Sequence, residues 1–184
     1  MIRWFCFISL ILSLHSAHAE DGAHQIKFSY RNADIVKVVE EYAKESHERF
    51  MVDPSVKGKV TIINPDRITL AEAYNQLSSA LALNSVAISK QGDIFVVSPS
   101  RAVQRSLIEV GSELPSLKPE RMFTWIIQLK YASADEINKQ IRTLSSKDGE
   151  LVPYTRNNQI LITDWVSNLH RVAKIVDQLD VKAK

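Results

Sequence analysis

The chain has 184 residues, and its 23 lysine and arginine residues nearly balance 21 aspartate and glutamate residues, for a formal net charge of +2. A charge so close to zero provides no electrostatic attraction for nucleic acid or for an anionic lipid surface. The five glycines form neither a G-x-G pair nor a phosphate-binding loop. We therefore expect neither nucleic-acid binding nor a nucleotide site.

Residues 1–19 have the features of a cleavable export signal. Arg3 provides a short basic region, residues 4–14 form an apolar run, and Ala17 and Ala19 place small side chains before a cleavage site. The apolar run is too short to cross a bilayer as a helix, which takes about 20 residues. No later run is as long, so we predict an exported, soluble protein without direct membrane insertion.

The only cysteine, Cys6, lies within this signal and would be removed with it. An exported chain without cysteines forms no disulfides, so packing alone must stabilise its fold. This favours the bacterial periplasm over a disulfide-rich secreted scaffold.

Residues 99–121 contain several prolines and serines and predict a linker between two modules, residues 20–98 and 122–184. Within the linker, residues 101–110 predict a helix capped by Ser100. Domains this small bury only about 60% of the surface that their unfolded chains expose. We therefore expect each module to gain stability by packing against a neighbour.

The first module is predicted to have the order βαββαββ. Asp34 is the expected N-cap of its first helix, and Thr69 and Glu72 form a capping box for the second. Asn84 is expected to end that second helix in a left-handed conformation. The expected elements are a strand at 26–30, a helix at 35–43, strands at 49–52 and 59–63, a helix at 70–81, and a hairpin at 86–89 and 94–98.

The second module is predicted to have the order βαββα. Ser133 and Glu136 suggest a capping box for its first helix, and Asp164 is the expected cap of its last. The expected strands lie at 123–131, 150–154 and 160–163, and the expected helices begin after residues 133 and 164. The fold class is therefore α+β, with two small domains.

Stretches of the first module resemble the short N-terminal domain shared by bacterial secretins and TonB-dependent receptors. Secretins are the outer-membrane channels of type II secretion and type IV pilus systems. The resemblance is carried by Asp34-Ile35, VDPSVKGKVTI at 52–62, LAEAYNQLSSAL at 70–81 and DIFVV at 93–97.

The second module is similar to the KH-like ring-building repeat that follows this domain in secretins. The similar stretches are LKYASADEI at 129–137, NNQILITD at 157–164 and IVDQLD at 175–180. A secretin continues into a pore domain, which has no counterpart in either module. The resemblance therefore implies the periplasmic vestibule of such a machine, as a stand-alone accessory or as a split secretin.

No group of residues predicts catalysis, a metal or a cofactor. His24, His47 and His170 have no short ligand spacing and no cysteine partners, which argues against a zinc site. The order βαββα also occurs in KH RNA-binding domains, but no two glycines here have the spacing of their GXXG loop. We expect no enzymatic activity.

Protein–protein contacts remain as the expected chemistry. An unpaired strand edge can accept a strand from a partner, and 25–30 or the segment near 60–63 is the expected edge. Lys57 and Lys59 either protect this edge from aggregation or attract an acidic partner. The candidate interaction edge consists of Lys57, Lys59, Val60, Thr61, Ile62 and Ile63.

In the second module, a candidate ring interface combines a helix face with a turn. Its residues are Lys139, Arg142, Arg156, Asn157 and Asn158. The simpler alternative for the last three is that they only form the turn of a hairpin.

Together these expectations indicate a non-enzymatic periplasmic component of a secretin-type secretion or pilus machine, associated with an outer-membrane secretin. Its expected partners are secretin subunits or copies of itself, and an inner-membrane or periplasmic component. The alternative is a signalling module like that of TonB-dependent transducers, although these lack the second repeat.

Overall fold

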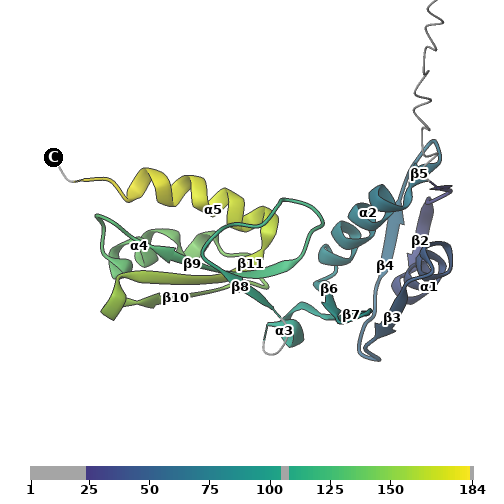
Figure 1. The fold of residues 1–184 in the computed structure, drawn as a ribbon, viewed down its shortest axis with the longest axis horizontal. Coiled ribbons are helices and arrows are strands. Elements are labelled where there is room, and N and C mark those ends of the chain that lie inside the picture. Colours follow the sequence, from purple (N-terminus) through teal and green to yellow (C-terminus); the bar gives the residue numbers. More distant parts are fainter. Residues whose placement is uncertain (1–23, 105–107, 183–184) are drawn as a thin grey trace, which may run out of the picture.

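A computed structural model describes residues 24–104 and 108–182 (Figure 1). The predicted export signal, 1–19, lies outside the described residues. The structure consists of two α+β domains arranged along the long axis of the molecule. This confirms the predicted fold class.

The first domain follows the predicted order, except that its first strand is broken in two and a short extra strand precedes the second helix. Its elements are β1 (Gln25–Ile26), β2 (Tyr30–Asp34), α1 (Ile35–Ser46), β3 (Arg49–Val52), β4 (Lys59–Ile62), β5 (Ile68–Thr69), α2 (Leu70–Ala82), β6 (Val86–Gln91) and β7 (Ile94–Pro99). The break arises because β1 pairs with β5 whereas β2 pairs with β4.

The two β-type runs of the VDPSVKGKVTI stretch lie in different sheets. Strand β3 runs parallel to β7 in the sheet β3-β7-β6, and β4 runs antiparallel to β2. The loop between them turns at Asp53, whose carboxylate accepts the Ser55 backbone N–H at 2.8 Å. Gly58 then takes a φ of +134°, which only glycine adopts readily.

Both helix starts in the first domain are confirmed. The Val36 backbone N–H donates to Asp34 at 2.9 Å, and Thr69 and Glu72 form a complete capping box. The prediction for Asn84 is wrong, because Ser85 takes the left-handed conformation with φ 54°. Asn84 stays in a helical turn, where its side-chain amide donates to the Ala80 carbonyl at 3.2 Å.

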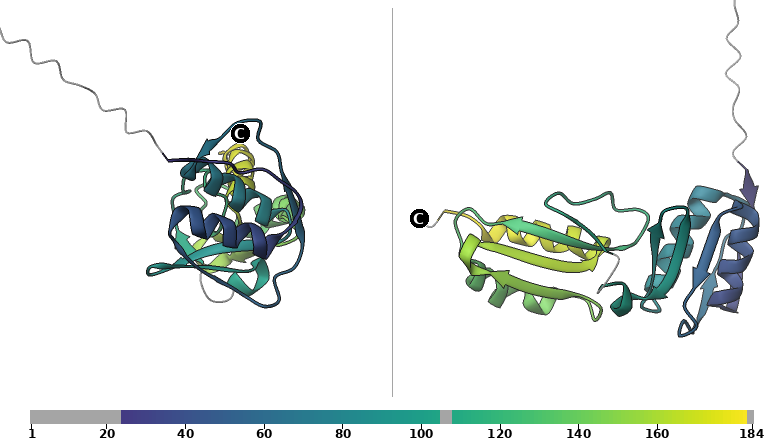
Figure 2. Two further views of the ribbon diagram at one scale, coloured as in Figure 1. Left: turned by 90° about the vertical axis from the view of Figure 1, so that its right-hand side faces the viewer. Right: turned by 60° about the horizontal axis from the view of Figure 1, so that its bottom comes forward.

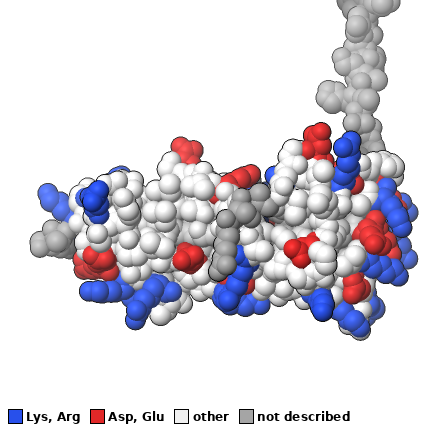
Figure 3. Space-filling view, turned by 90° about the horizontal axis from the view of Figure 1, so that it is seen from below, with Lys and Arg blue, Asp and Glu red and all other residues white. Residues whose placement is uncertain are grey.

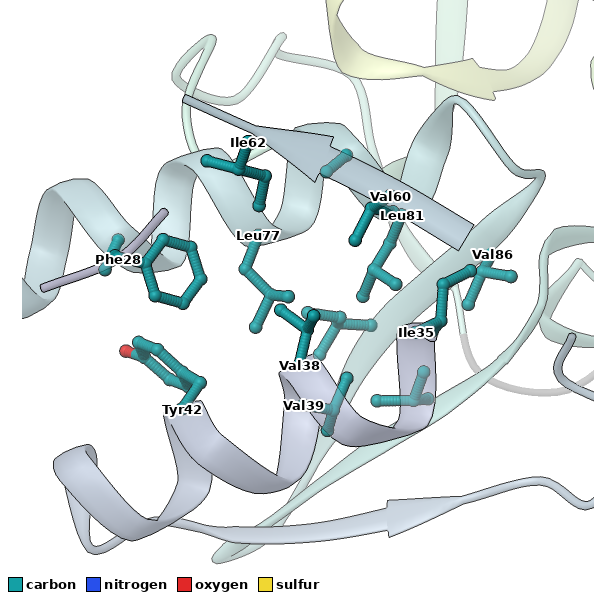
Figure 4. Close-up of a cluster of buried hydrophobic side chains, with 14 of the residues drawn as sticks. Phe28, Ile35, Val38, Val39, Tyr42, Val60, Ile62, Leu77, Leu81 and Val86 are labelled. Atoms are coloured by element: carbon teal, nitrogen blue, oxygen red, sulfur yellow. The ribbon is translucent and has the colours of Figure 1, made fainter. Parts of the chain in front are cut away.

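Apolar side chains of α1, α2 and β4 meet in the core of the first domain (Figure 4). The labelled members are Phe28, Ile35, Val38, Val39, Tyr42, Val60, Ile62, Leu77, Leu81 and Val86. All of them are buried, so the helices cover one face of the strands and leave the other faces to solvent or to the second domain.

The second domain is a four-stranded sheet of order β10-β11-β9-β8. Its elements are β8 (Glu109–Gly111), β9 (Met122–Gln128), α4 (Ala134–Ile141), the 3-10 turn η1 (Arg142–Leu144), β10 (Glu150–Tyr154), the 3-10 turn η2 (Thr155–Asn157), β11 (Gln159–Trp165) and α5 (Val166–Leu179). Both helices pack on one face of the sheet, around buried side chains such as Ile137, Ile160 and Leu169.

Two sequence-based predictions near this domain are wrong. The helix expected at 101–110 is a single turn, α3 (Ser100–Val103), and Ser100 is its first residue instead of its cap. Strand β8 follows it and pairs parallel to β9, as the edge strand of the second sheet. Asp164 does not cap α5 either: it lies inside β11 with a fully buried side chain.

Candidate protein-interaction surfaces

Strand β4 has one strand neighbour, β2, among the described residues. On its other side a groove of about 520 Å³ separates β4 from α2. Ile63 and Leu83 lie on the two sides of this groove with 63% and 82% of their surfaces exposed. An unpaired strand edge beside exposed apolar side chains can bind an extended segment of another protein.

The six predicted edge residues divide into two groups. Val60 and Ile62 are 5% and 7% exposed, because alternate side chains of β4 point into the core. Lys59, Thr61 and Ile63 therefore provide the accessible side chains of the strand and its end, while Lys57 is exposed in the preceding loop.

Polar contacts fix the end of β4 against α2. The side-chain amides of Asn64 and Gln76 exchange two hydrogen bonds, of 2.8 and 3.0 Å. Asn64 also donates to the Phe28 carbonyl, and Ser29 Oγ donates to the Ile62 carbonyl at 3.3 Å. The floor of the groove is thus held in place by side chains outside the apolar core.

The sheet of the second domain leaves one face open. In the right-hand view of Figure 2 its strands lie in front of helices α4 and α5. Cross-strand pairing places Val152, Leu161 and Ile126 in one row on this open face, and Tyr154 extends it on β10. The sequence predicted a strand at 150–154, but only the structure shows that no helix of the described chain covers this face.

The predicted ring residues lie at separate positions of the second domain. Lys139 and Arg142 are exposed in and just after α4, on the helix layer, whereas Arg156 and Asn157 are exposed in the turn between β10 and β11. Asn158 is engaged internally: its side chain accepts the Ala134 N–H at 2.8 Å and donates to the Ala132 carbonyl at 2.9 Å.

Asp180, just after α5, clamps the loop between β9 and α4. Its carboxylate accepts the backbone N–H groups of Lys130, Tyr131 and Ala132 at 2.8, 2.7 and 2.9 Å. Burial alone would raise the pKa of Asp180, but these donors and the Lys130 charge outweigh it and hold the pKa below its ordinary value. The clamp presents the exposed ring of Tyr131 on a fixed loop.

Figure 3 shows acidic and basic residues interspersed on one face, with wide uncharged areas between them. Within residues 24–104 and 108–182 there is no group of three histidine, cysteine, aspartate or glutamate side chains suited to a metal ion. The helices of this part of the chain are all too short or too polar to cross a membrane.

Two family profiles match the chain, one on each domain. Residues 28–97 match the "GspD-like, N0 domain", and residues 124–184 match the "Bacterial type II/III secretion system short domain". The chain thus carries two secretin N-terminal modules in succession. It is homologous to the N-terminal regions of secretins.

Secretin XcpQ of Pseudomonas aeruginosa is 27% identical over 95% of this chain and 28% of its own length. The type IV pilus biogenesis and competence protein PilQ of Neisseria meningitidis is 24% identical over 87% of this chain and 22% of its own length. The chain therefore spans about a quarter of these curated relatives.

Among solved structures, the Klebsiella pneumoniae type II secretion system outer membrane complex of PulD, PulS and the PulC HR domain has a similar fold. The TM-score is 0.73 at 20% identity, over 84% of this chain and 26% of that one. This likeness supports the fold of both domains.

Proposed function

We propose that the chain is a non-enzymatic periplasmic component of a secretin-type secretion or pilus machine, exported by the signal in residues 1–19. The observation that carries this proposal is the succession of two secretin modules, each with an uncovered surface suited to protein contacts. The module boundaries 20–98 and 122–184, with the linker 99–121, stay predictions.

The first domain is proposed to dock an inner-membrane or periplasmic component of the machine. The groove between β4 and α2 fits an extended strand, since Thr61 and Ile63 flank an unpaired edge and Leu83 faces it. The related Klebsiella complex contains PulS and the PulC HR domain beside PulD, which supports a partner of this kind.

The second domain is proposed to assemble side by side with copies of itself or with secretin subunits. A ring requires two different surfaces on each subunit, so that the contact repeats head to tail. The open sheet face with Val152 and Tyr154 provides one surface, and the helix layer with Lys139 and Arg142 provides a different one. Arg156 and Asn157 are proposed to contact the neighbour at the rim.

Sedimentation of the protein with and without the secretin of the same organism tests the assembly. We expect the mixture to form a complex larger than either component, and the Val152→Asp variant to lose it. Val181→Asp, at another exposed site beyond α5, is the matched control. A mixture that contains only the free components would contradict the proposal.

The signalling alternative assigns no role to the second domain. A binding partner that contacts only the first domain, with assembly unaffected by Val152→Asp, would favour it.

A further inference from the structure

A third cluster of buried side chains joins the two domains. Its members are Ala87 in β6, Val103 in α3, Met122 at the start of β9 and Trp165 at the end of β11. All four are buried, and the first belongs to one domain while the last two belong to the other. Apolar burial at this joint therefore requires the domains to keep one relative position.

The loop 145–149 supports Trp165 from the side of the second domain. The indole Nε1–H of Trp165 donates to Asp148 at 3.2 Å, and both side chains are buried. Asp164 fixes this loop, because its buried carboxylate accepts the backbone N–H of Ser146 at 2.8 Å and the hydroxyl of the same residue. Gly149 passes so close that a Cβ atom there would collide with the Asp164 carboxylate.

The same loop contacts the connection between the domains. The Gln104 side-chain amide, just after α3, donates to the Asp148 carbonyl. At the start of α3, the Ser100 backbone N–H donates to the Ser85 carbonyl of the first domain at 2.8 Å. These hydrogen bonds thus connect loop 145–149 to the segment of α3, and α3 to the first domain, in addition to the contacts of the apolar cluster.

This joint brings a residue of the second domain to the docking groove. Lys118, in the loop between β8 and β9, lines the groove between β4 and α2. Leu83 lines the groove and also an adjoining hollow of about 370 Å³, whose other walls include Trp165 and Arg171. The groove therefore has walls from both domains and continues across the joint.

We propose that the docking groove is a composite site, completed by Lys118 only while the joint around Trp165 is closed. Its occupant is an extended partner strand with apolar side chains beside Ile63 and Leu83 and an acidic side chain toward Lys118. Lys118 can pair with that acidic side chain because it forms no ion pair within the described chain. Binding and the interdomain angle are then coupled, because a strand that prefers the closed joint stabilises it. The identity of the occupant rests on the proposed docking function, whereas the closure of the joint does not depend on that function.

A spin label tests the closure of the joint without any partner. Lys118→Cys, in a Cys6→Ser background that removes the only native cysteine, carries a nitroxide, and methyl NMR signals of Ile63 and Leu83 report its proximity. We expect the label to broaden both signals in the parent protein and the broadening to disappear with Val103→Asp. Val110→Asp, exposed in β8, is the matched control and retains the broadening.

Absence of broadening in the parent protein, or its persistence with Val103→Asp, overturns the composite site. If Val103→Asp does not fold, Trp165→Phe replaces it. A smaller aromatic ring then takes the place of the indole and the hydrogen bond to Asp148 is lost, so weaker broadening is required. A synthetic peptide of alternating valine and threonine with a terminal glutamate then tests coupling. Tighter binding to the control than to the open variant supports the proposal, and equal binding overturns it. No binding to either rejects docking at β4, whatever the label shows.

Discussion

The carboxylate of Asp180 and the backbone N–H of Tyr131 lie 2.7 Å apart, which joins the end of α5 to the loop after β9. Two neighbouring N–H groups donate to the same carboxylate. We therefore expect Asp180→Asn to lower the free energy of unfolding by about 1–2 kcal/mol, since an amide accepts fewer hydrogen bonds and sets its own donor against N–H groups. Urea unfolding followed by circular dichroism measures the loss. Asp177→Asn, exposed on the same helix, is the control and should change stability by less than about 0.5 kcal/mol.

The contribution of Asp180 should depend on pH in one direction. Burial raises the pKa of Asp180, but the backbone donors and the charge of Lys130 lower it by more. The pKa of Asp180 in the folded chain is therefore below that in the unfolded chain, which is about 3.9. The stabilisation is therefore complete above the unfolded pKa and disappears as the pH falls through the folded pKa. Urea unfolding of the parent and Asp180→Asn should show a constant difference from pH 5 to 8 that shrinks in acid. A difference that grows in acid would refute this assignment.

Gly149→Ala should destabilise the second domain by about 1–3 kcal/mol, because the new methyl group would collide with the buried Asp164 carboxylate. Thermal unfolding measures the effect as a lower Tm. Lys147→Ala, exposed in the same loop, should leave the Tm nearly unchanged. Equal Tm values for the two variants would show that the loop relaxes without cost.

Leu83→Asp should lower the stability only slightly, by about 0.3–1 kcal/mol, because it places a carboxylate at the C-cap of α2. It should weaken binding of the partner at the first domain, because its side chain is exposed beside the groove. Met51→Asp, similarly exposed on β3 away from that groove, should bind like the parent protein. Isothermal titration with the purified partner component distinguishes the two. If both variants bind equally well, the partner does not use the groove.

Local signals predicted the helix starts well, since Asp34 and Thr69 act on backbone groups two or three residues away. Asp164 has the same type of side chain before a helix, yet its carboxylate is used by Ser146 in a distant loop. Strand β8 was missed for a related reason: its pairing with β9 depends on an edge that forms only in the folded domain.

The candidate surfaces were predicted in part. Alternation along β4 is a local property, so the sequence indicated a strand there, but the burial of Val60 and Ile62 depends on which face meets the helices. The internal role of Asn158 depends on Ala132 and Ala134, which are far from it in the sequence. The Asp180 clamp and the role of Lys118 in the groove likewise join distant segments and left no sequence signal that we recognised.

Asp34 occupies two structural positions at once. It ends β2 opposite Lys59 of β4, and it begins α1 as the N-cap. A shift of the β2–β4 pairing by one residue would turn Val60 toward solvent and Lys59 toward the core. The backbone N–H of Ile35, the first residue of α1, donates to the Gly58 carbonyl just before β4 at 3.1 Å, so the same shift would also break a hydrogen bond between the helix start and this strand. The start of α1 and the alignment of the strand that borders the docking groove are therefore coupled.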